Sequence, residues 1–482
     1  MRKIAHFLFK DNYSRAAFAL FVVGVFFRLY RLGAFVTFLG DQGRDAIIVK
    51  RILTLEHLPA IGAPTSVGQI YLGPFYYYFI APWLLLFNFE PIGLAFGVAF
   101  FSSLFILVFY HLIKKIFDPM TALISAFFIT FSSVLVEYSR FSWNPNLLPL
   151  FSLLFIYALF LGLKTSKKLY FLLSGMFLSF VIQLHYLGVL FMLPLFFVVV
   201  KNIIGRRKEI KHCFVRWGIC IVSFLFFSAP LAIFDMRHQF LNAKSFLKLF
   251  EGGGGIQDSK LDSLAETVRL LHLYAIGVPM SFFLSILTFI AMIILVVLMR
   301  KNAARFFLFF LIFLIIGFSF YAGPKFPHYY GVFYPFYYVV IAYCIAYLYR
   351  FRAGKIIAVV FLLTFLFIQR KGYGFLTGKG SYQVETAKKI SKIIYENVTK
   401  NKYTTTALPH KYSDSTYRYF LELWEKKPIE KDSLERADEL FVVCEVACTP
   451  VGDPQWDIAY FAPRLIVGEW REGNITIYKL IR

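Results

Sequence analysis

Charged residues and cysteines are scarce in this chain of 482 residues. Aspartate, glutamate, lysine and arginine make up only 16% of it, whereas apolar residues make up 59% and aromatic residues 20%. A soluble domain carries about 25% charged residues, so this composition excludes an ordinary soluble protein. Apolar runs long enough to form membrane-spanning helices recur between Ala16 and Gln369. The composition therefore indicates an integral membrane protein.

The five cysteines exclude a zinc site of the usual kind. Cys213, Cys220 and Cys344 lie in or beside apolar runs, where a thiol acts as a small packing residue. Cys444 and Cys448 lie in the polar tail, without a matching Cys or His pair nearby. If the tail is exported, these two can form a disulfide, and two reduced thiols are the alternative; the sequence leaves both open.

Acidic residues are also few, which leaves a net charge of +23. The basic residues do not gather on one surface but cluster in short connections between apolar runs. These clusters lie at 2–15, 114–115, 164–168, 206–211, 300–305 and 350–355. Basic connections of this kind mark cytoplasmic loops, so the charge reports topology and argues against nucleic-acid binding.

A cytoplasmic N-terminus and about eleven spans keep every basic cluster in the cytoplasm. We expect these spans near 16–35, 92–113, 119–136, 145–163, 169–186, 188–202, 214–233, 275–299, 304–321, 330–349 and 356–370. The run Pro74–Phe87 is short and contains Pro82, so we interpret it as an interfacial or re-entrant helix. The alternative is a true span, which would export Lys114 and Lys115.

This topology predicts two parts: a membrane body at 1–370 and an extracytoplasmic domain at 371–482. Helical patterns at 382–398 and 415–424 and strand patterns at 403–408, 440–446 and 475–480 predict a small α/β fold for the second part. The predicted fold class is an α-helical polytopic membrane protein with a small C-terminal α/β soluble domain. Two large outer loops are expected at about 36–91 and about 235–273.

An acidic segment, Gly40–Asp45, begins the first outer loop. Asp41 could meet a lipid-borne substrate there in water and act as a catalytic acid or base; the plain alternative is the N-cap of an amphipathic helix. We expect that helix over 45–57, along the membrane surface. Arg44 is interpreted as a phosphate ligand or an interface cation, and Asp45 as part of the same wall.

Other candidate binding residues lie in the remaining outer loops. Tyr71 and Tyr76 suit sugar or prenyl stacking, or an aromatic belt at the membrane interface. Arg140, Asn144 and Asn146 suit hydroxyl and phosphate recognition, or simple capping of a helix end.

Two further groups lie at the outer ends of later spans. His185 and Tyr186 interrupt an apolar stretch, as site residues or as satisfied loop residues. Lys325, His328 and Tyr329 form a turn that suits a lipid phosphate, with a snorkelling lysine and belt tyrosine as the alternative. Four glycines at 252–255 predict a hinge, either in a lid or in an inert loop tip.

These residues resemble the GT-C glycosyltransferases. The likeness rests on the acid after the first span, the helix behind it, the Gly-Pro-Phe-Tyr-Tyr-Tyr segment at 73–78, the basic residues ahead of Phe117 and the pair Ser139 and Arg140. It is strongest at 28–150 and favours bacterial proteins similar to protein O-mannosyltransferases and lipid A aminoarabinose transferases.

The resemblance implies transfer of a sugar from a polyprenyl-phosphate donor to a lipid, glycan or protein acceptor. Asp41 matches the family's first-loop acid, the general base, and Lys325 and His328 match the region that handles the lipid phosphate. The family's second acid is missing, because Asn144 and Asn146 occupy its place. A divalent cation is therefore optional.

The alternative function is a polytopic transporter or a lipid or glycan flippase. Transporters concentrate ionisable residues near the middle of the membrane, whereas the predicted spans are almost free of charge there. We therefore expect an enzyme of the cell membrane that works at the outer face among membrane lipids.

Overall fold

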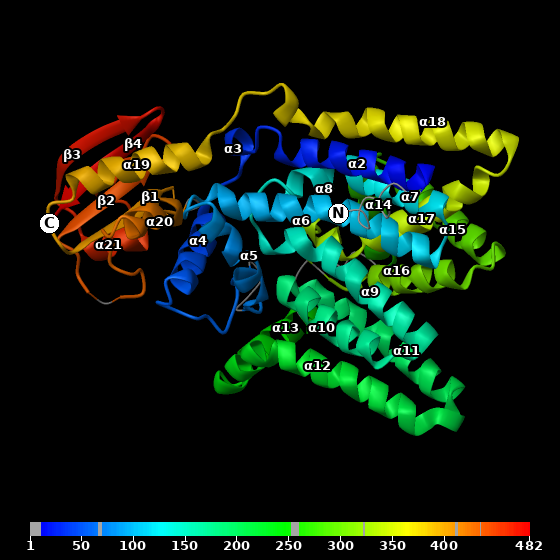
Figure 1. Ribbon diagram of the computed structural model, residues 1–482. Helices are drawn as coiled ribbons and strands as arrows, with labels where there is room; N and C mark the ends of the chain where they lie inside the picture. The colour runs from blue at the N-terminus through cyan, green and yellow to red at the C-terminus, as the bar shows by residue number, and fades with distance from the viewer. Residues whose placement is uncertain (1–10, 66–69, 252–259, 322, 410–412, 434) are drawn as a thin grey trace.

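The computed structural model describes residues 11–65, 70–251, 260–321, 323–409, 413–433 and 435–482. A bundle of apolar helices forms most of the chain, and a four-stranded sheet with its own helices lies at one end of the bundle (Figure 1). The fold class expected from the sequence is confirmed: a helical membrane body carries a small C-terminal sheet domain.

Each predicted span coincides with an apolar helix. These are α2 (Asn12–Leu29), α6 (Ile92–Ile116), α7 (Pro119–Phe131), α9 (Leu148–Thr165), α10 (Lys168–Leu184), α11 (Met192–Gly205), α12 (Ile210–Arg237), α15 (Phe282–Leu298), α16 (Asn302–Ser319), α17 (Tyr334–Leu348) and α18 (Arg352–Gln369). Among the described residues, seven helices are long and apolar enough to cross a membrane by length and composition. The count of eleven crossings and the orientation stay predictions.

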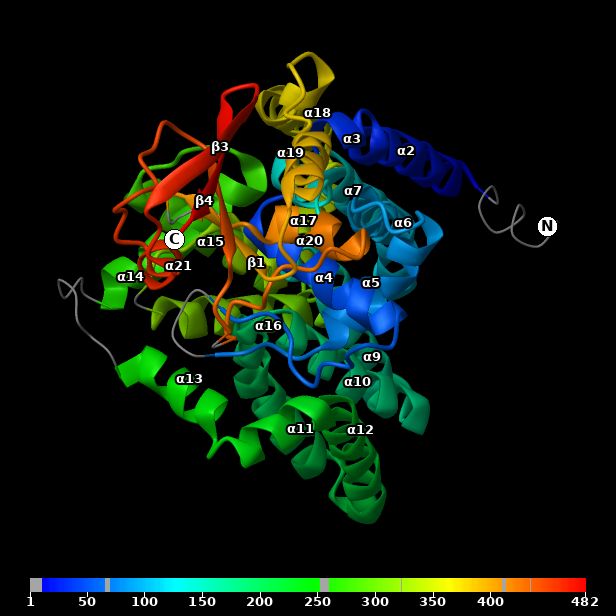
Figure 2. The ribbon, with the colours of Figure 1, turned by 90° about the vertical axis from the view of Figure 1, so that its left-hand side faces the viewer.

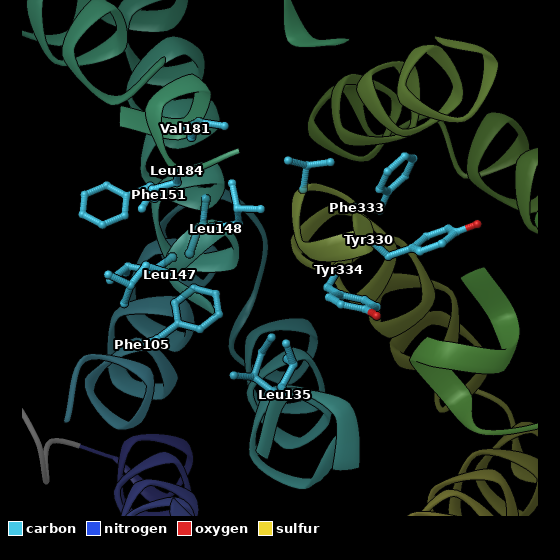
Figure 3. Close-up of a cluster of buried hydrophobic side chains, with 14 of the residues drawn as sticks. Phe105, Leu135, Leu147, Leu148, Phe151, Val181, Leu184, Tyr330, Phe333 and Tyr334 are labelled. Atoms are coloured by element: carbon cyan, nitrogen blue, oxygen red, sulfur yellow. The ribbon is translucent and has the colours of Figure 1, made fainter. Parts of the chain in front are cut away.

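The core of the bundle is rich in tyrosine and phenylalanine. Side chains from α6, α9 and α10 and from the segment that leads into α17 belong to one buried cluster (Figure 3). Tyr338 of α17 is 1% exposed, and its hydroxyl donates to the carbonyl of Ala275 at 2.9 Å and to Ser132 Oγ at 3.0 Å. Buried tyrosines need such partners, because an unpaired hydroxyl in an apolar core is costly.

The segment expected to be the first outer loop contains three helices: α3 (Leu32–Phe35), α4 (Gly40–Leu53) and the short apolar α5 (Phe75–Leu86). The predicted start of α4 was wrong. The helix begins at Gly40 rather than at 45, so Asp41 lies inside its first turn. It packs between α5 and helix α20 (Ser415–Leu423) of the C-terminal domain, and its location along the membrane surface stays a prediction.

The C-terminal domain contains α19 (Gln383–Asn397), β1 (Tyr403–Leu408), α20, β2 (Glu439–Cys444), α21 (Trp456–Phe461), β3 (Leu465–Glu472) and β4 (Ile475–Ile481). The strand order is β1-β2-β4-β3; β1 and β2 are parallel, and the other pairs are antiparallel. The three predicted strands are present. We missed the edge strand β3, because its largely exposed side chains give no apolar alternation.

Two views place α20 beside α4, at the junction between the bundle and the sheet domain (Figures 1 and 2). Cys444 and Cys448 form a disulfide at the end of β2, which decides the alternative that the sequence left open. Cys213, Cys220 and Cys344 are buried free thiols, as expected of packing residues.

The segment expected to be the second outer loop contains α13 (Leu241–Glu251) and α14 (Lys260–Ile276). The glycines at its tip, 252–255, lie outside the described residues. Asn242 at the start of α13 accepts from the Tyr71 N–H at 2.8 Å and donates to its carbonyl at 3.1 Å, whereas α14 packs on α15 and α16. The two arms of the predicted lid therefore attach to different parts of the body.

Candidate functional site

A cavity of about 970 Å³ lies where α4 meets the C-terminal domain. We call it the Asp41 cavity. Its membrane-body wall includes Asp41, Arg44, Phe141 and Trp143, and its C-terminal wall includes Thr386, Ser413, Ser415, Tyr417 and Glu445. The volume is at the upper end of the range for small-molecule sites, so the cavity has room for a ligand of several rings.

Three helices begin at this cavity. Asp41 lies in the first turn of α4, Gln383 is the first residue of α19, and Ser415 is the first residue of α20. The N-terminus of a helix carries a partial positive charge, which stabilises a carboxylate there. Asp41 is not the N-cap, because Leu39 occupies that position. Capping therefore does not account for Asp41.

Asp41, Arg44 and Asp45 form a charged triad on α4. Arg44 Nη1 donates to Asp41 Oδ1 at 2.7 Å, and its Nε and Nη2 donate to Asp45 Oδ1 at 3.0 and 2.7 Å. The Tyr77 hydroxyl of α5 also donates to Asp45 Oδ1, at 3.1 Å. The Asp45 side chain is 1% exposed, whereas that of Asp41 is 50% exposed. Asp45 is thus the buried anchor of the triad, and Asp41 is its accessible acid.

The electrostatics of the triad follow from this difference in burial. Burial alone would lower the pKa of Arg44, but the neighbouring carboxylates of Asp45 and Asp41 outweigh it and raise that pKa. Burial raises the pKa of Asp45, and the guanidinium of Arg44 opposes the shift. Arg44 therefore stays a cation, but two acids already share its charge.

Two glycines explain why the sequence around Asp41 is suited to this junction. A Cβ atom at Gly40 would stand 2.5 Å from Ser413 Cβ, and one at Gly43 would stand 2.5 Å from the Thr416 nitrogen. No side chain fits at such distances. The glycines let the start of α20 touch the backbone of α4, while Asp41 and Arg44 project into the cavity beside it.

Ion pairs strengthen this contact further along α4. Arg51 donates to Glu422 Oε1 and Oε2 of α20 at 2.8 and 2.6 Å, and to Glu430 Oε1 at 2.6 Å. Glu422 is 8% exposed, so the two-point contact is largely shielded from water. The C-terminal domain is thus held against the helix that carries Asp41.

Arg140, a predicted phosphate ligand, binds backbone carbonyls of the protein itself. Its guanidinium donates to the carbonyls of Phe27, Arg28 and Tyr30 at 2.7, 3.2 and 2.9 Å, at the end of α2. These carbonyls are among those a helix leaves without an internal partner. Its plane also lies 3.9 Å from the Phe375 ring.

The neighbouring amides are engaged in the same way. Asn144 Nδ2 donates to the Leu184 carbonyl at 2.6 Å, and Asn146 Nδ2 donates to the Phe141 carbonyl at 2.9 Å. Both contacts fix the path of the 138–147 turn. This turn places Phe141 and Trp143 in the wall of the Asp41 cavity.

Four predicted site residues form an aromatic group behind Trp143. The His328 ring lies 4.5 Å from the Trp143 ring, the His185 ring lies 4.4 Å from Tyr186, and the His185 and Tyr329 rings are 5.0 Å apart. Burial lowers the pKa of His328 to about 4. At neutral pH this imidazole is therefore uncharged and supplies no cation for a phosphate.

The other predicted binding residues lie away from the Asp41 cavity. Lys325 Nζ donates to Ser263 Oγ of α14 at 2.9 Å. Tyr71 packs on Phe234 and binds Asn242 at the start of α13. Tyr76 is 2% exposed, and its hydroxyl lies 2.6 Å from Ser142 Oγ. Of the predicted site residues, Asp41 and Arg44 line the cavity. Asp45 contacts Arg44, and His328 contacts the wall residue Trp143.

A divalent cation fits these residues poorly. Asp41 and Asp45 already share Arg44, whose charge repels a metal ion at the same carboxylates. Among the described residues, no group of three His, Cys, Asp or Glu side chains is arranged to hold a metal.

Sequence reasoning missed the residues that the C-terminal domain contributes. Glu445 and Ser415 line the same cavity as Asp41 although about 400 residues separate them along the chain. Glu445 directly follows the buried strand β2, and an acid at the end of a buried strand was the available signal. Nothing in the sequence indicated that this strand end faces α4.

The fold defines the class: a polytopic helical membrane protein with a small C-terminal sheet domain. Comparison with known proteins agrees. Residues 72–233 match the family described as dolichyl-phosphate-mannose-protein mannosyltransferase. A search of curated proteins finds no match.

Two solved structures show the same fold. ArnT from Cupriavidus metallidurans, bound to undecaprenyl phosphate, is 12% identical with a TM-score of 0.60, and the alignment covers 97% of each chain. The oligosaccharyltransferase AglB from Archaeoglobus fulgidus, in complex with an inhibitory peptide and a dolichol-phosphate, is 13% identical with a TM-score of 0.55. That alignment covers 88% of this chain and 65% of AglB. At these identities the likeness concerns the fold.

Proposed function

We propose that this protein transfers a sugar from a polyprenyl-phosphate donor to an acceptor at the outer face of the cell membrane, with Asp41 as the general base. The observation that carries the proposal is the contrast within the triad. Asp45 is buried against Arg44, whereas Asp41 is half-exposed and faces a cavity of about 970 Å³. A general base must reach the proton that it removes, and only Asp41 of the two acids can.

In the proposed reaction, Asp41 accepts the proton of an acceptor hydroxyl or amine. The acceptor atom forms a bond to the anomeric carbon of the sugar, and the bond from that carbon to the phosphate oxygen breaks. The electron pair leaves with the polyprenyl phosphate, and the anomeric configuration inverts. Arg44 holds Asp41 in place through the 2.7 Å contact and is the cation closest to it in the cavity wall.

The solved relatives support the type of donor. ArnT was solved with undecaprenyl phosphate and AglB with a dolichol-phosphate, both of them polyprenyl phosphates. Lys325 and His328 were predicted to handle this phosphate. His328 contacts Trp143, which is a wall residue of the cavity, so the turn that carries His328 lies beside the site. The His328 side chain is neutral there, because its pKa is lowered.

The test is an Asp41→Asn variant assayed in membranes with a panel of polyprenyl-phosphate sugars, by release of free polyprenyl phosphate. We expect loss of at least about 100-fold, the usual contribution of a general base, at unchanged protein abundance. Glu56→Gln is the matched control, because Glu56 is an exposed acid just beyond α4 that pairs with Lys50. Retained transfer by Asp41→Asn would exclude the base role. Donor movement across the membrane without sugar transfer would favour the flippase alternative.

A further inference from the structure

The two walls of the Asp41 cavity differ in chemistry. The membrane-body wall presents the aromatic rings of Phe141 and Trp143 beside the triad. The C-terminal wall presents hydroxyl groups, among them those of Ser413, Ser415 and Tyr417, and the carboxylate of Glu445. A ligand between these walls meets flat apolar faces on one side and many small hydrogen-bonding groups on the other.

A sugar ring matches this pair of walls. Its C–H groups form an apolar face that stacks on an aromatic ring, and its hydroxyls form an edge that donates to carboxylates and exchanges hydrogen bonds with Ser and Thr. A peptide is a poorer match, because peptide sites offer a free strand edge or a run of apolar pockets. Here only Ala387 and Ile475 are aliphatic on the C-terminal wall.

Glu445 is held in a fixed position on that wall. Its backbone N–H donates to the Leu408 carbonyl at 3.0 Å, and its side chain accepts from the Tyr417 hydroxyl. It also directly follows Cys444, whose disulfide to Cys448 closes the loop. A carboxylate fixed in this way loses little freedom when it binds, which favours affinity.

The wall is also fixed relative to Asp41. Gly40 and Gly43 bring the start of α20 onto the backbone of α4, and Arg51 binds Glu422 of α20 at 2.6 Å. The Tyr419 hydroxyl of α20 adds a hydrogen bond of 2.5 Å to the Phe89 carbonyl of the body. Asp41 on one wall and Glu445 on the other can therefore contact the same ligand.

We propose that the acceptor of this protein is a glycan and that Glu445 positions it, by accepting hydrogen bonds from its hydroxyls while a ring of the glycan stacks on Trp143. This inference rests on the proposed function, since it makes the ligand of the cavity the acceptor. Glu445 is a binding residue, and the sugar transfer itself stays with Asp41. The membrane body lacks the family's second acid; the second acid proposed here, Glu445, lies on the C-terminal domain and binds the acceptor.

The experiment uses the full-length protein in lipid nanodiscs on an array of cell-surface oligosaccharides, with arrays of peptides and of lipid headgroups in parallel. We expect binding to glycans that falls about tenfold in Glu445→Gln, the effect of one lost hydrogen bond to a charged group. Glu469→Gln is the control: Glu469 is an exposed acid of β3 that pairs with Arg471 outside the cavity wall.

Binding to peptides or lipid headgroups in place of glycans would overturn the proposal, as would equal glycan binding by Glu445→Gln and the unaltered protein. Failure of the transferase hypothesis gives a different result. In that case transfer survives in Asp41→Asn, or never occurs, while glycan binding still depends on Glu445. With a glycan from the array as acceptor, Glu445→Gln should raise the acceptor KM about tenfold and leave the donor KM unchanged.

Discussion

Gly43 of α4 lies directly against the backbone of Thr416 at the start of α20, so that a Cβ atom at Gly43 would stand 2.5 Å from the Thr416 nitrogen. This contact joins the membrane body to the C-terminal domain beside the triad of Asp41, Arg44 and Asp45. The same turn of helix thus docks one domain on the other and presents the candidate base.

Gly43→Ala should therefore weaken the junction. The added methyl group meets backbone atoms, which cannot rotate away, and overpacking of this kind costs about 1–3 kcal/mol. We expect a lower unfolding midpoint in detergent, faster proteolysis between α18 and α19, and reduced transfer. Gly218→Ala in α12 is the control, because among the described residues no atom beyond its own stretch of helix lies within 4 Å of its added Cβ. Equal behaviour of the two variants would contradict the tight contact.

Arg44→Gln should destabilise the protein more than a surface substitution does. It leaves the Asp45 carboxylate, 1% exposed, without its cation, and breaking such a buried pair costs about 3 kcal/mol. The double variant Arg44→Gln with Asp45→Asn should recover most of the loss, because no buried charge then remains. The measurement is the unfolding midpoint of the two single variants and the double variant. A double variant no more stable than Arg44→Gln alone would show that the pair is not coupled.

Arg140→Lys separates a structural role from phosphate binding. A lysine keeps the charge but cannot reach the three carbonyls of Phe27, Arg28 and Tyr30 with one ammonium group. We expect a loss of about 2 kcal/mol in unfolding free energy, with transfer per folded molecule retained. Arg370→Lys, at an exposed position after α18, is the control. If Arg140 binds the donor phosphate, the donor KM rises and the stability stays the same.

His328 predicts a specific dependence of stability on pH. Its pKa is lowered by burial from 6.5 to about 4, so between these values the unfolded chain binds a proton that the folded protein does not. The contribution of His328 is fully present above pH 6.5 and is lost as the pH falls toward 4. His328→Phe keeps a ring against Trp143 and should flatten this part of the curve. An unaltered slope in His328→Phe would contradict the lowered pKa.

Much of the architecture follows from local sequence signals. Apolar runs such as 92–113 and 330–349 form helices because an apolar segment in the membrane must satisfy its own backbone hydrogen bonds. The strands at 403–408 and 439–444 were recognisable from their β-branched and apolar residues. The edge strand β3 was not, because its short apolar run is interrupted by Gly468 and shows no alternation of apolar and polar residues.

The candidate site was predictable only in part. Asp41 and Arg44 could be found because they follow the first span, and the structure places both in one cavity wall. The role of Arg140 could not be assigned, because a guanidinium beside a turn can bind either a phosphate or backbone carbonyls. Only the position of the end of α2 shows that Arg140 binds three carbonyls there. Glu445 and Ser415 were out of reach, since their closeness to Asp41 depends on how α20 packs on α4.

By itself, the sequence determined the membrane class, the positions of the apolar helices and the acidic turn of Asp41, because burial in lipid and helix or strand periodicity act on neighbouring residues. Only the tertiary structure decided which acid of that turn is accessible, which cations are already engaged, and that the C-terminal domain forms the second wall of the cavity. These properties depend on contacts between segments far apart in the chain. Gly40 and Gly43 permit the close contact between α4 and α20, but only the folded protein shows that α20 is their partner.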